Sequence, residues 1–263
     1  MPIVRSGDAD INYNTSGQGI PVLLIMGLAA DSAMWIMQVP ALEAAGYQVI
    51  TLDNRGVGAS SSPPGPYTME TMAADALAVL DVLGIEKAHV VGVSMGGAIA
   101  QELALKAPER IRSLTLVSTW AETNEYTRRL DDLGRLILDN LGREALIRAS
   151  MFWLFTPKLF IENPAMVDMI EQMAVAMQGN EAAFINQTAA VREHHLIDRL
   201  HEIAAPTLIV VGRRDILVPP ELSERIAERI PNSVLTILDG GHAFTFEHAD
   251  QFNAELVGWL ASN

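Results

Sequence analysis

The chain contains no cysteine among its 263 residues. This absence excludes a disulfide framework and any metal site built on thiolates. Basic residues are also scarce, because 18 Lys and Arg stand against 32 Asp and Glu, which gives a formal net charge of −14. Nucleic acids and anionic membranes are bound by clustered Lys and Arg. The sequence therefore argues against a nucleic-acid or membrane partner and favours a small-molecule substrate.

Long apolar runs are missing as well. The stretch from Pro21 to Ala30 falls far below the roughly 20 residues that a membrane-spanning helix needs, and the first eight residues hold no apolar core of the kind found in signal peptides. We therefore expect a cytoplasmic protein. Hydrophobic residues nevertheless make up 49% of the chain, which is enough to bury the core of one α/β domain with an inserted element.

Outside the middle of the chain, short β-branched runs alternate with longer helical patterns. Such alternation is typical of a mostly parallel sheet with helices on both faces. The predicted strands are Val22–Ile25, Gln48–Leu52, His89–Val93, Leu114–Val117, Leu208–Val211 and Val234–Leu238. The predicted helices are Ala33–Ala44, Met69–Leu83, Met95–Lys106, Glu221–Arg229 and Asp250–Leu260.

The strand signal disappears between about Trp120 and Ile203, where the sequence is helical and rich in methionine and aromatic residues. A connection of this length is uncommon unless it is a functional lid or is disordered, and its apolar content argues against disorder. We therefore predict a helical cap over residues 120–203, inserted into an α/β core that consists of residues 1–119 and 204–263.

The segment Gly92-Val93-Ser94-Met95-Gly96-Gly97 carries the clearest chemical signal. It follows a β-branched run and opens into a helix-forming one, which places Ser94 on a sharp turn from strand to helix. The flanking glycines leave room for that turn, and the helix directs its N-terminus at the serine oxygen. A serine between glycines is commonly only a turn residue, but this setting favours a nucleophile.

Four segments, in this order, carry a family resemblance: Asp53-Asn54-Arg55-Gly56-Val57-Gly58-Ala59-Ser60, the turn at Ser94, Gly212-Arg213-Arg214-Asp215 and Gly240-Gly241-His242. With them the chain resembles the α/β-hydrolase fold superfamily from about residue 10 to its end, apart from the divergent cap. Serine, then aspartate, then histidine is the order that this fold uses. The resemblance implies an α/β-hydrolase fold, with a mostly parallel central sheet flanked by helices and an inserted helical cap.

The three residues have matching chemical roles. Ser94 would attack a substrate carbonyl, and His242 would remove the serine proton and return it to the leaving group. Asp215 would hold the imidazole in the correct tautomer and stabilise its protonated form. Asp53 and Asp239 are the competing acids, and both are more simply explained as turn residues. The alternative for Asp215 is an acid in an exposed turn, and for His242 a histidine of a glycine-rich loop.

The resemblance also implies an oxyanion hole, formed by the backbone N–H groups of Leu28 and Met95. The chain departs from the family pattern at one position near this oxyanion hole. Many relatives carry His-Gly where this chain has Met26-Gly27, and that histidine helps to hold the loop of the first donor. In this chain the loop must be held in another way.

The cap is expected to shape the substrate pocket. Trp120, Trp153, Leu217 and Phe244 are the predicted substrate-binding residues, two from the cap and two beside Asp215 and His242. Most apolar residues of the cap are better explained by core packing. The adjacent His194 and His195 suggest a metal site only weakly, because neighbouring helical residues point in different directions. No metal or organic cofactor is expected.

Among capped members, the sequence is similar to 3-oxoadipate enol-lactonase-like enzymes and small carboxylesterases. The predicted function is therefore hydrolysis of carboxylic esters or lactones of small, largely apolar substrates through an acyl-enzyme on Ser94. Two alternatives stay open. One is an enol-lactonase or carbon–carbon bond hydrolase of aromatic degradation, and the other is a hydrolase-derived ligand receptor with little turnover.

Overall fold

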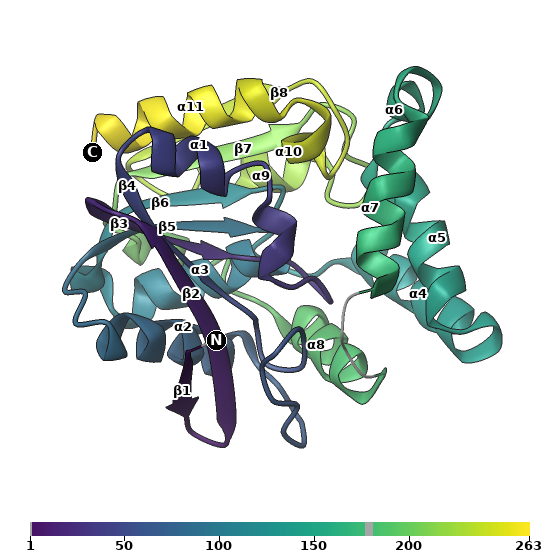
Figure 1. Ribbon diagram of the computed structural model, residues 1–263, viewed down its shortest axis with the longest axis horizontal. Helices are drawn as coiled ribbons and strands as arrows, with labels where there is room; N and C mark the ends of the chain where they lie inside the picture. Colours follow the sequence, from purple (N-terminus) through teal and green to yellow (C-terminus); the bar gives the residue numbers. More distant parts are fainter. Residues whose placement is uncertain (1, 177–180) are drawn as a thin grey trace.

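Eight strands form one sheet in the computed structural model, which describes residues 2–176 and 181–263 (Figure 1). The strands are β1 (Ile3–Ser6), β2 (Ala9–Gly17), β3 (Ile20–Ile25), β4 (Tyr47–Leu52), β5 (Ala88–Val93), β6 (Ile111–Val117), β7 (Thr207–Gly212) and β8 (Ser233–Leu238). Their order across the sheet is β1-β2-β4-β3-β5-β6-β7-β8. Strand β2 pairs antiparallel with both of its neighbours, and the other pairs are parallel.

The six predicted strands are all present, each extended by one to three residues. The sequence did not reveal β1 and β2. Strand β2 is rich in Asn, Thr and Ser, which are not the residues of a buried parallel strand, and it lies at the antiparallel side of the sheet. The observed sheet and its flanking helices confirm the predicted fold class.

Outside the insertion, the helices are α1 (Val39–Ala44), α2 (Met69–Val82), α3 (Met95–Lys106), α9 (Pro220–Ala227), α10 (Phe244–Glu247) and α11 (Ala249–Ala261). Helix α3 has the predicted bounds. The single helix predicted over Ala33–Ala44 is wrong, because a 3₁₀ turn at Ser32–Trp35 and the separate helix α1 take its place. Pro40 explains the break, since proline fits only the first turn of a helix.

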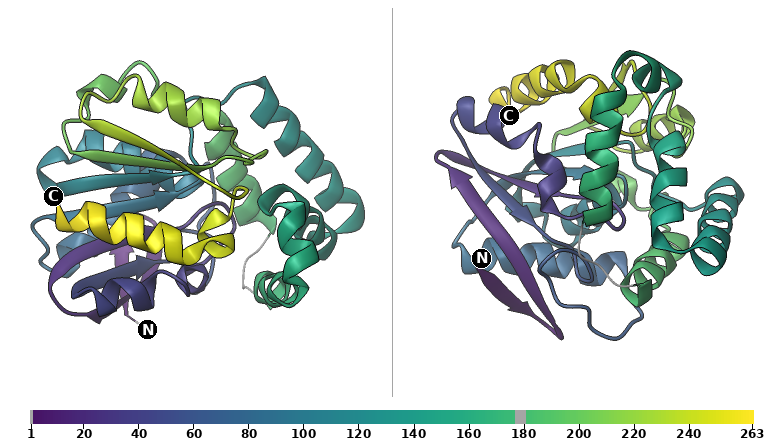
Figure 2. Two further views of the ribbon diagram at one scale, coloured as in Figure 1. Left: turned by 90° about the horizontal axis from the view of Figure 1, so that it is seen from above. Right: turned by 45° about the vertical axis from the view of Figure 1, so that its right-hand side comes forward.

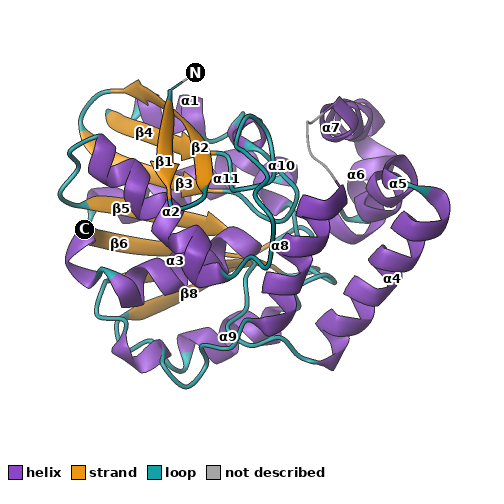
Figure 3. Cartoon of the chain, turned by 90° about the horizontal axis from the view of Figure 1, so that it is seen from below, coloured by secondary structure: helices purple, strands orange, loops and turns teal. Residues whose placement is uncertain are grey.

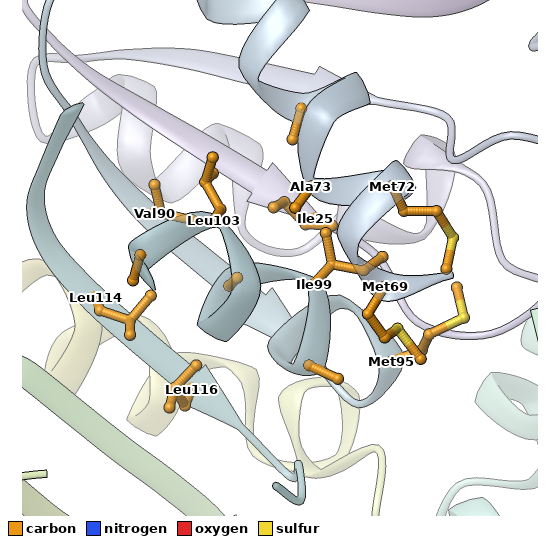
Figure 4. Packing of buried hydrophobic residues seen from close by; sticks show 14 of the residues in the cluster. Ile25, Met69, Met72, Ala73, Val90, Met95, Ile99, Leu103, Leu114 and Leu116 are labelled. Carbon is orange, nitrogen blue, oxygen red and sulfur yellow. The ribbon is translucent and has the colours of Figure 1, made fainter. Parts of the chain in front are cut away.

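Each strand of the central sheet contributes to two cores, because alternate side chains point to opposite faces. On one face, Leu23 and Val90 pack with helices α2, α3 and α9, as Figure 4 shows for the part around α2 and α3. On the other face, Leu24 and Val91 pack with α1 and α11. Both layers are filled with fully buried aliphatic side chains, so the carboxyl ends of the parallel strands are held in fixed positions.

The described residues between β6 and β7 form five further helices: α4 (Glu125–Leu141), α5 (Arg143–Leu154), α6 (Pro157–Glu162), α7 (Pro164–Ala176) and α8 (Glu181–Glu193). We call them the cap helices. They stand beyond the carboxyl ends of the parallel strands, away from the layers that cover the sheet (Figures 1 and 2). Seen from below, α8 is the cap helix nearest to the sheet, and α4 to α7 lie farther out (Figure 3).

A small core of its own joins helices α5 to α7 to the rest of the chain. Met151, Phe155 and Ile170 pack there with Phe246 of α10. Among the helices described, none is both long enough and apolar enough to cross a membrane.

Candidate active site

Ser94 lies where β5 gives way to α3, with φ 55° and ψ −121°. An L-residue rarely adopts a positive φ, and such backbone strain is found mostly at functional sites. The backbone is held in this shape from both sides. The Ser94 N–H donates to the Val117 carbonyl at 2.8 Å, and the Thr119 hydroxyl donates to the Ser94 carbonyl at 2.7 Å. The turn therefore presents the side chain of Ser94 at the carboxyl edge of the sheet.

Two glycines make this turn possible. A Cβ at Gly92 would lie 2.2 Å from the carbonyl oxygen of Gly96, and a Cβ at Gly96 would lie 2.1 Å from that of Ile25. Backbone groups occupy both positions, so neither glycine tolerates a side chain without a shift of the main chain. The spacing Gly-x-Ser-x-Gly thus follows from the close approach of strand and helix.

His242 and Asp215 form the second part of the site. His242 follows β8 and Asp215 follows β7, and both side chains are almost completely buried. The imidazole Nδ1 of His242 lies 2.8 Å from Asp215 Oδ2. The other carboxylate oxygen accepts the backbone N–H groups of Leu217 at 3.0 Å and Val218 at 2.7 Å. These bonds fix the carboxylate, and a carboxylate in this position makes Nδ1 the donor and leaves Nε2 free to accept a proton.

The histidine loop is held by a further carboxylate. Glu247 of α10 accepts the N–H of Gly241 through Oε2 at 3.1 Å. Its Oε1 accepts the N–H of Thr156, just before α6, at 2.5 Å. One side chain thereby connects the residue before His242 with the cap helices.

Ser94 and His242 line the same cavity, whose volume is about 350 Å³. In the described part of the chain, no hydrogen bond joins the Ser94 hydroxyl to the His242 ring. Contacts between a nucleophile and its base are often long without substrate and shorten in the complex. The cavity therefore holds a strained serine together with a histidine that is oriented by an aspartate.

The predicted oxyanion donors lie on either side of Ser94. Met95 is the first residue of α3, and its N–H has no partner within the helix. Leu28 lines the cavity in the loop after β3, and Gly27 lies so close to Ser94 that a Cβ there would be 3.2 Å from the serine Cβ. The side chain of Met95 packs in the core, so only its backbone can serve the site.

The structure also shows what holds the loop that follows β3. Gln187 of α8 is fully buried; its Oε1 accepts the N–H of Ala29 at 2.9 Å, and its Nε2 donates to the carbonyl of Arg55 at 2.9 Å. The amide of Asn54 donates to the Met26 carbonyl at 2.9 Å. These two side chains support the loop at Met26-Gly27, where many members of the family that the chain resembles carry histidine.

Three of the four predicted substrate-binding residues line the cavity, namely Trp120, Trp153 and Leu217. The fourth does not. Phe244 is fully buried in the core beside α11, where its ring packs edge to face with Phe252 at 5.6 Å between centroids. The expectation for Phe244 is corrected accordingly: within the single turn of α10, Phe244 faces the core, whereas Phe246, two residues later, lines the cavity.

Sequence reasoning missed the polar residues of the cavity wall. Among the described residues of the wall, Asp131 of α4 and Thr188 of α8 have buried, unpartnered oxygens, Asp131 Oδ2 and Thr188 Oγ1. Burial raises the pKa of Asp131 to about 6. Each residue interrupts an otherwise apolar helical face. This interruption was the signal in the sequence that could have identified them, because burying a carboxylate or hydroxyl without a hydrogen-bond partner costs free energy.

The competing acids have structural partners. Asp53 accepts from the Asn12 side chain at 2.8 Å and from the backbone N–H groups of Ser32 and Ala59 at 2.9 Å. Asp239 pairs with Arg214 at 3.0 Å. Both anchor turns, as the sequence suggested.

His194 and His195 differ from expectation in one respect, because α8 ends at Glu193 and neither residue is helical. His194 is buried against Trp120, which lowers its pKa to about 4 through desolvation, and His195 is exposed beside Glu122. Within residues 2–176 and 181–263, no group of three or more His, Asp or Glu is arranged to hold a metal ion.

Comparison with known proteins agrees with this geometry. Residues 20–249 match the family model described as alpha/beta hydrolase fold. A protein of Azorhizobium caulinodans that carries the name carbamate hydrolase RutD is 39% identical over 260 residues, which cover 98% of each chain.

Two solved structures are also similar. The enol-lactonase from Burkholderia xenovorans has a TM-score of 0.91 at 27% identity and covers 99% of this chain and 100% of its own. A thermophilic esterase from Thermogutta terrifontis has a TM-score of 0.88 at 27% identity and covers 99% of this chain and 98% of its own.

Proposed function

The chain belongs to the α/β-hydrolase fold family and is a hydrolase, and we propose that it cleaves carboxylic esters or lactones of small, largely apolar substrates through an acyl-enzyme on Ser94. One observation carries the proposal. The strained Ser94 shares a cavity with His242, whose Nδ1 lies 2.8 Å from the buried Asp215 carboxylate. These are the parts that acyl transfer to serine requires.

In the first half of the reaction, Ser94 Oγ attacks the carbonyl carbon while His242 Nε2 takes the hydroxyl proton. The carbonyl oxygen gains the negative charge, and the N–H groups of Leu28 and Met95 donate to it. A donor of this kind typically contributes about 2.7–4 kcal/mol to the transition state. The bond from carbon to the leaving oxygen then breaks, and His242 gives its proton to the departing alkoxide.

The second half releases the acid. Water attacks the acyl carbon as His242 Nε2 accepts one of its protons, and the bond to Ser94 Oγ breaks as the same proton passes to the serine oxygen. Asp215 stays ionised throughout and stabilises the imidazolium formed in each half. For a lactone, the leaving alkoxide remains joined to the acyl group, so the product is a single hydroxy acid.

The shape and lining of the cavity support a small apolar substrate. Its walls are mainly aliphatic and aromatic, and they include Trp120, Trp153 and Leu217. A volume of about 350 Å³ accommodates a molecule of modest size.

Carbamate hydrolysis is a second candidate. The relative that carries the name carbamate hydrolase RutD is 39% identical over nearly the whole of both chains, and a carbamate presents a carbonyl that the same serine chemistry can attack. The buried oxygens of the cavity wall could accept N–H donors, which an all-apolar pocket could not.

The test is hydrolysis of p-nitrophenyl acetate, butyrate and octanoate, followed through the initial burst and the steady state, with a carbamate ester beside them. We expect sustained turnover by the wild type and a loss of more than about a thousandfold in Ser94→Ala. Ser262→Ala, which changes an exposed serine far from the cavity, is the matched control. Activity that survives in Ser94→Ala would refute the nucleophile. A burst without turnover would favour a ligand receptor.

A further inference from the structure

Two cap helices present polar atoms to the cavity that have no hydrogen-bond partner among the described residues. Asp131 Oδ2 on α4 and Thr188 Oγ1 on α8 are both buried and unpartnered, and both residues line the cavity that contains Ser94. Buried polar oxygens in native proteins are nearly always hydrogen-bonded, so each exception calls for an explanation. At a cavity wall, a group that enters the cavity can donate to both of them.

The helices place these atoms on cavity-facing sides. On α4, Asp131 lies one turn after Thr127, and on α8, Thr188 lies one turn after Phe184; all four residues line the cavity. The same two helices are joined beyond the cavity by the ion pair of Asp132 with Arg192 at 2.7 Å. The positions of Asp131 and Thr188 therefore follow from how α4 packs against α8.

The nearby cation does not neutralise Asp131 by direct contact. Arg192 makes its ion pair with Asp132, and it reaches Asp131 only through its longer-range field. Burial outweighs that field and raises the pKa of Asp131 to about 6. At neutral pH the carboxylate is largely ionised and can only accept hydrogen bonds, and the Thr188 hydroxyl can also accept. A second carboxylate would be repelled from this position.

The other charged cap residues of the cavity wall are Arg143 and Glu181. The guanidinium of Arg143 donates to the carbonyls of Ala174 and Val175 at the end of α7, at 2.9 and 3.0 Å. This geometry directs the charge of Arg143 at the last turn of α7. Asp131 therefore determines which ligand charge is preferred at the α4–α8 side of the cavity.

We propose that Asp131 and Thr188 form a polar subsite that binds a hydroxyl, amide N–H or ammonium donor at the end of the substrate remote from the scissile carbonyl. This inference rests on the proposed function and narrows its substrate class. The acyl group is apolar where it passes Trp120 and Leu217, carries a hydrogen-bond donor at its far end, and is not a free carboxylate there. The enzyme thereby selects a neutral or cationic substrate over an anionic one of equal length.

The test compares three p-nitrophenyl esters of equal chain length, whose far ends differ: 6-hydroxyhexanoate, heptanoate and the monoester of pimelate. The readout is the ratio of kcat/KM between two esters in one variant, so that general effects on folding or catalysis cancel. In the wild type we expect the hydroxyl ester to exceed the methyl ester by roughly tenfold or more, because a methyl group leaves the two oxygens unpaired. The pimelate ester should be the poorest of the three.

Thr188→Val and Asp131→Leu keep the approximate volume and remove the acceptors. Each should abolish or reverse the preference for the hydroxyl ester, and Asp131→Leu should also improve the pimelate ester relative to heptanoate. Asp139→Leu changes an exposed acid of the same helix outside the cavity, and it should keep the wild-type ratio. A wild type that prefers heptanoate or pimelate, or ratios that the two variants leave unchanged, would overturn the proposal.

A binding measurement separates this inference from the proposed function. If the wild type hydrolyses none of the three esters, the proposed function fails, and thermal shifts with 1,6-hexanediol and 1-heptanol still decide the subsite. Stronger stabilisation by the diol, lost in Thr188→Val, would support the subsite without turnover. Equal stabilisation by both alcohols would mean that the two oxygens bind water only, and would refute it.

Discussion

Replacing Ser94 with glycine should abolish activity and yet leave the protein more stable than replacing it with alanine. Both variants remove the hydroxyl, so the loss of that group cancels in the comparison. The difference lies in the backbone, because φ 55° and ψ −121° mirror the extended conformation that an L-residue prefers. Glycine adopts the mirror conformation as readily as the ordinary one, and alanine does not.

The magnitude follows from two opposing terms. A residue held in a sparsely populated backbone region costs on the order of 1–3 kcal/mol, which glycine at position 94 would relieve. Glycine also loses more chain entropy on folding, which costs about 0.5–1 kcal/mol relative to alanine. The net advantage of Ser94→Gly over Ser94→Ala is therefore about 1 kcal/mol in the free energy of unfolding. In a protein of this size, that corresponds to roughly 2–4 °C in Tm.

Calorimetric or chemical unfolding of the two variants under identical conditions measures this difference. Ser150 supplies the control, since it lies within helix α5, where glycine should be less stable than alanine by about 1 kcal/mol. The two sites should thus give opposite orders of stability. If Ser94→Gly proves equal to or less stable than Ser94→Ala, the backbone at Ser94 stores no strain and the reasoning is refuted.

Three further predictions concern the support of the site. Gly92→Ala should lower the free energy of unfolding by about 3 kcal/mol or more, because its Cβ would lie 2.2 Å from a backbone oxygen. Gly258→Ala, in open space on α11, should instead raise it by about 0.5–1 kcal/mol. Equal effects of the two substitutions in urea unfolding would contradict this. Gln187→Met keeps the volume but removes the hydrogen bonds to Ala29, in the loop after β3, and to Arg55. We expect kcat for p-nitrophenyl butyrate to fall roughly tenfold with KM little changed. A change in KM alone would argue against a role of Gln187 in positioning the oxyanion donor. Burial raises the pKa of Asp131 in the folded state from 3.8 to about 6, so its charge opposes folding fully above pH 6 and not at all below about pH 3.8. Asp131→Asn should therefore stabilise the protein by roughly 1–3 kcal/mol at pH 8 and by almost nothing at pH 4. An equal gain at both pH values in thermal unfolding would refute this assignment.

The elements with local signals could be predicted from the sequence. Helix α3 begins directly after Ser94 because glycines and helix formers follow the serine, and its bounds match the prediction. The contact of His242 with Asp215 was expected from the family resemblance, and the structure shows why it forms: both residues follow neighbouring parallel strands whose carboxyl ends meet at one edge of the sheet. In each case the informative residues lie within a few positions of the element that they define.

The parts that were missed depend on contacts between distant segments. Gln187 is an ordinary polar residue of its helix, and only the fold shows that it bonds to Ala29, which lies 158 positions earlier. Phe244 was assigned to the pocket because it lies near His242, but the short turn of α10 rotates it into the core. Proximity in sequence does not determine on which side of a one-turn helix a residue points.

The role of Gln187 bears on how such enzymes can be recombined. A designer who grafts the cap helices of one relative onto the core of another would treat the insertion as an independent module that sets only selectivity. Here α8 brings with it the amide that bonds to Ala29 and Arg55. A graft without an equivalent amide would release the segment after β3 and slow turnover for every substrate, so this helix is better inherited together with the core than with the rest of the insertion.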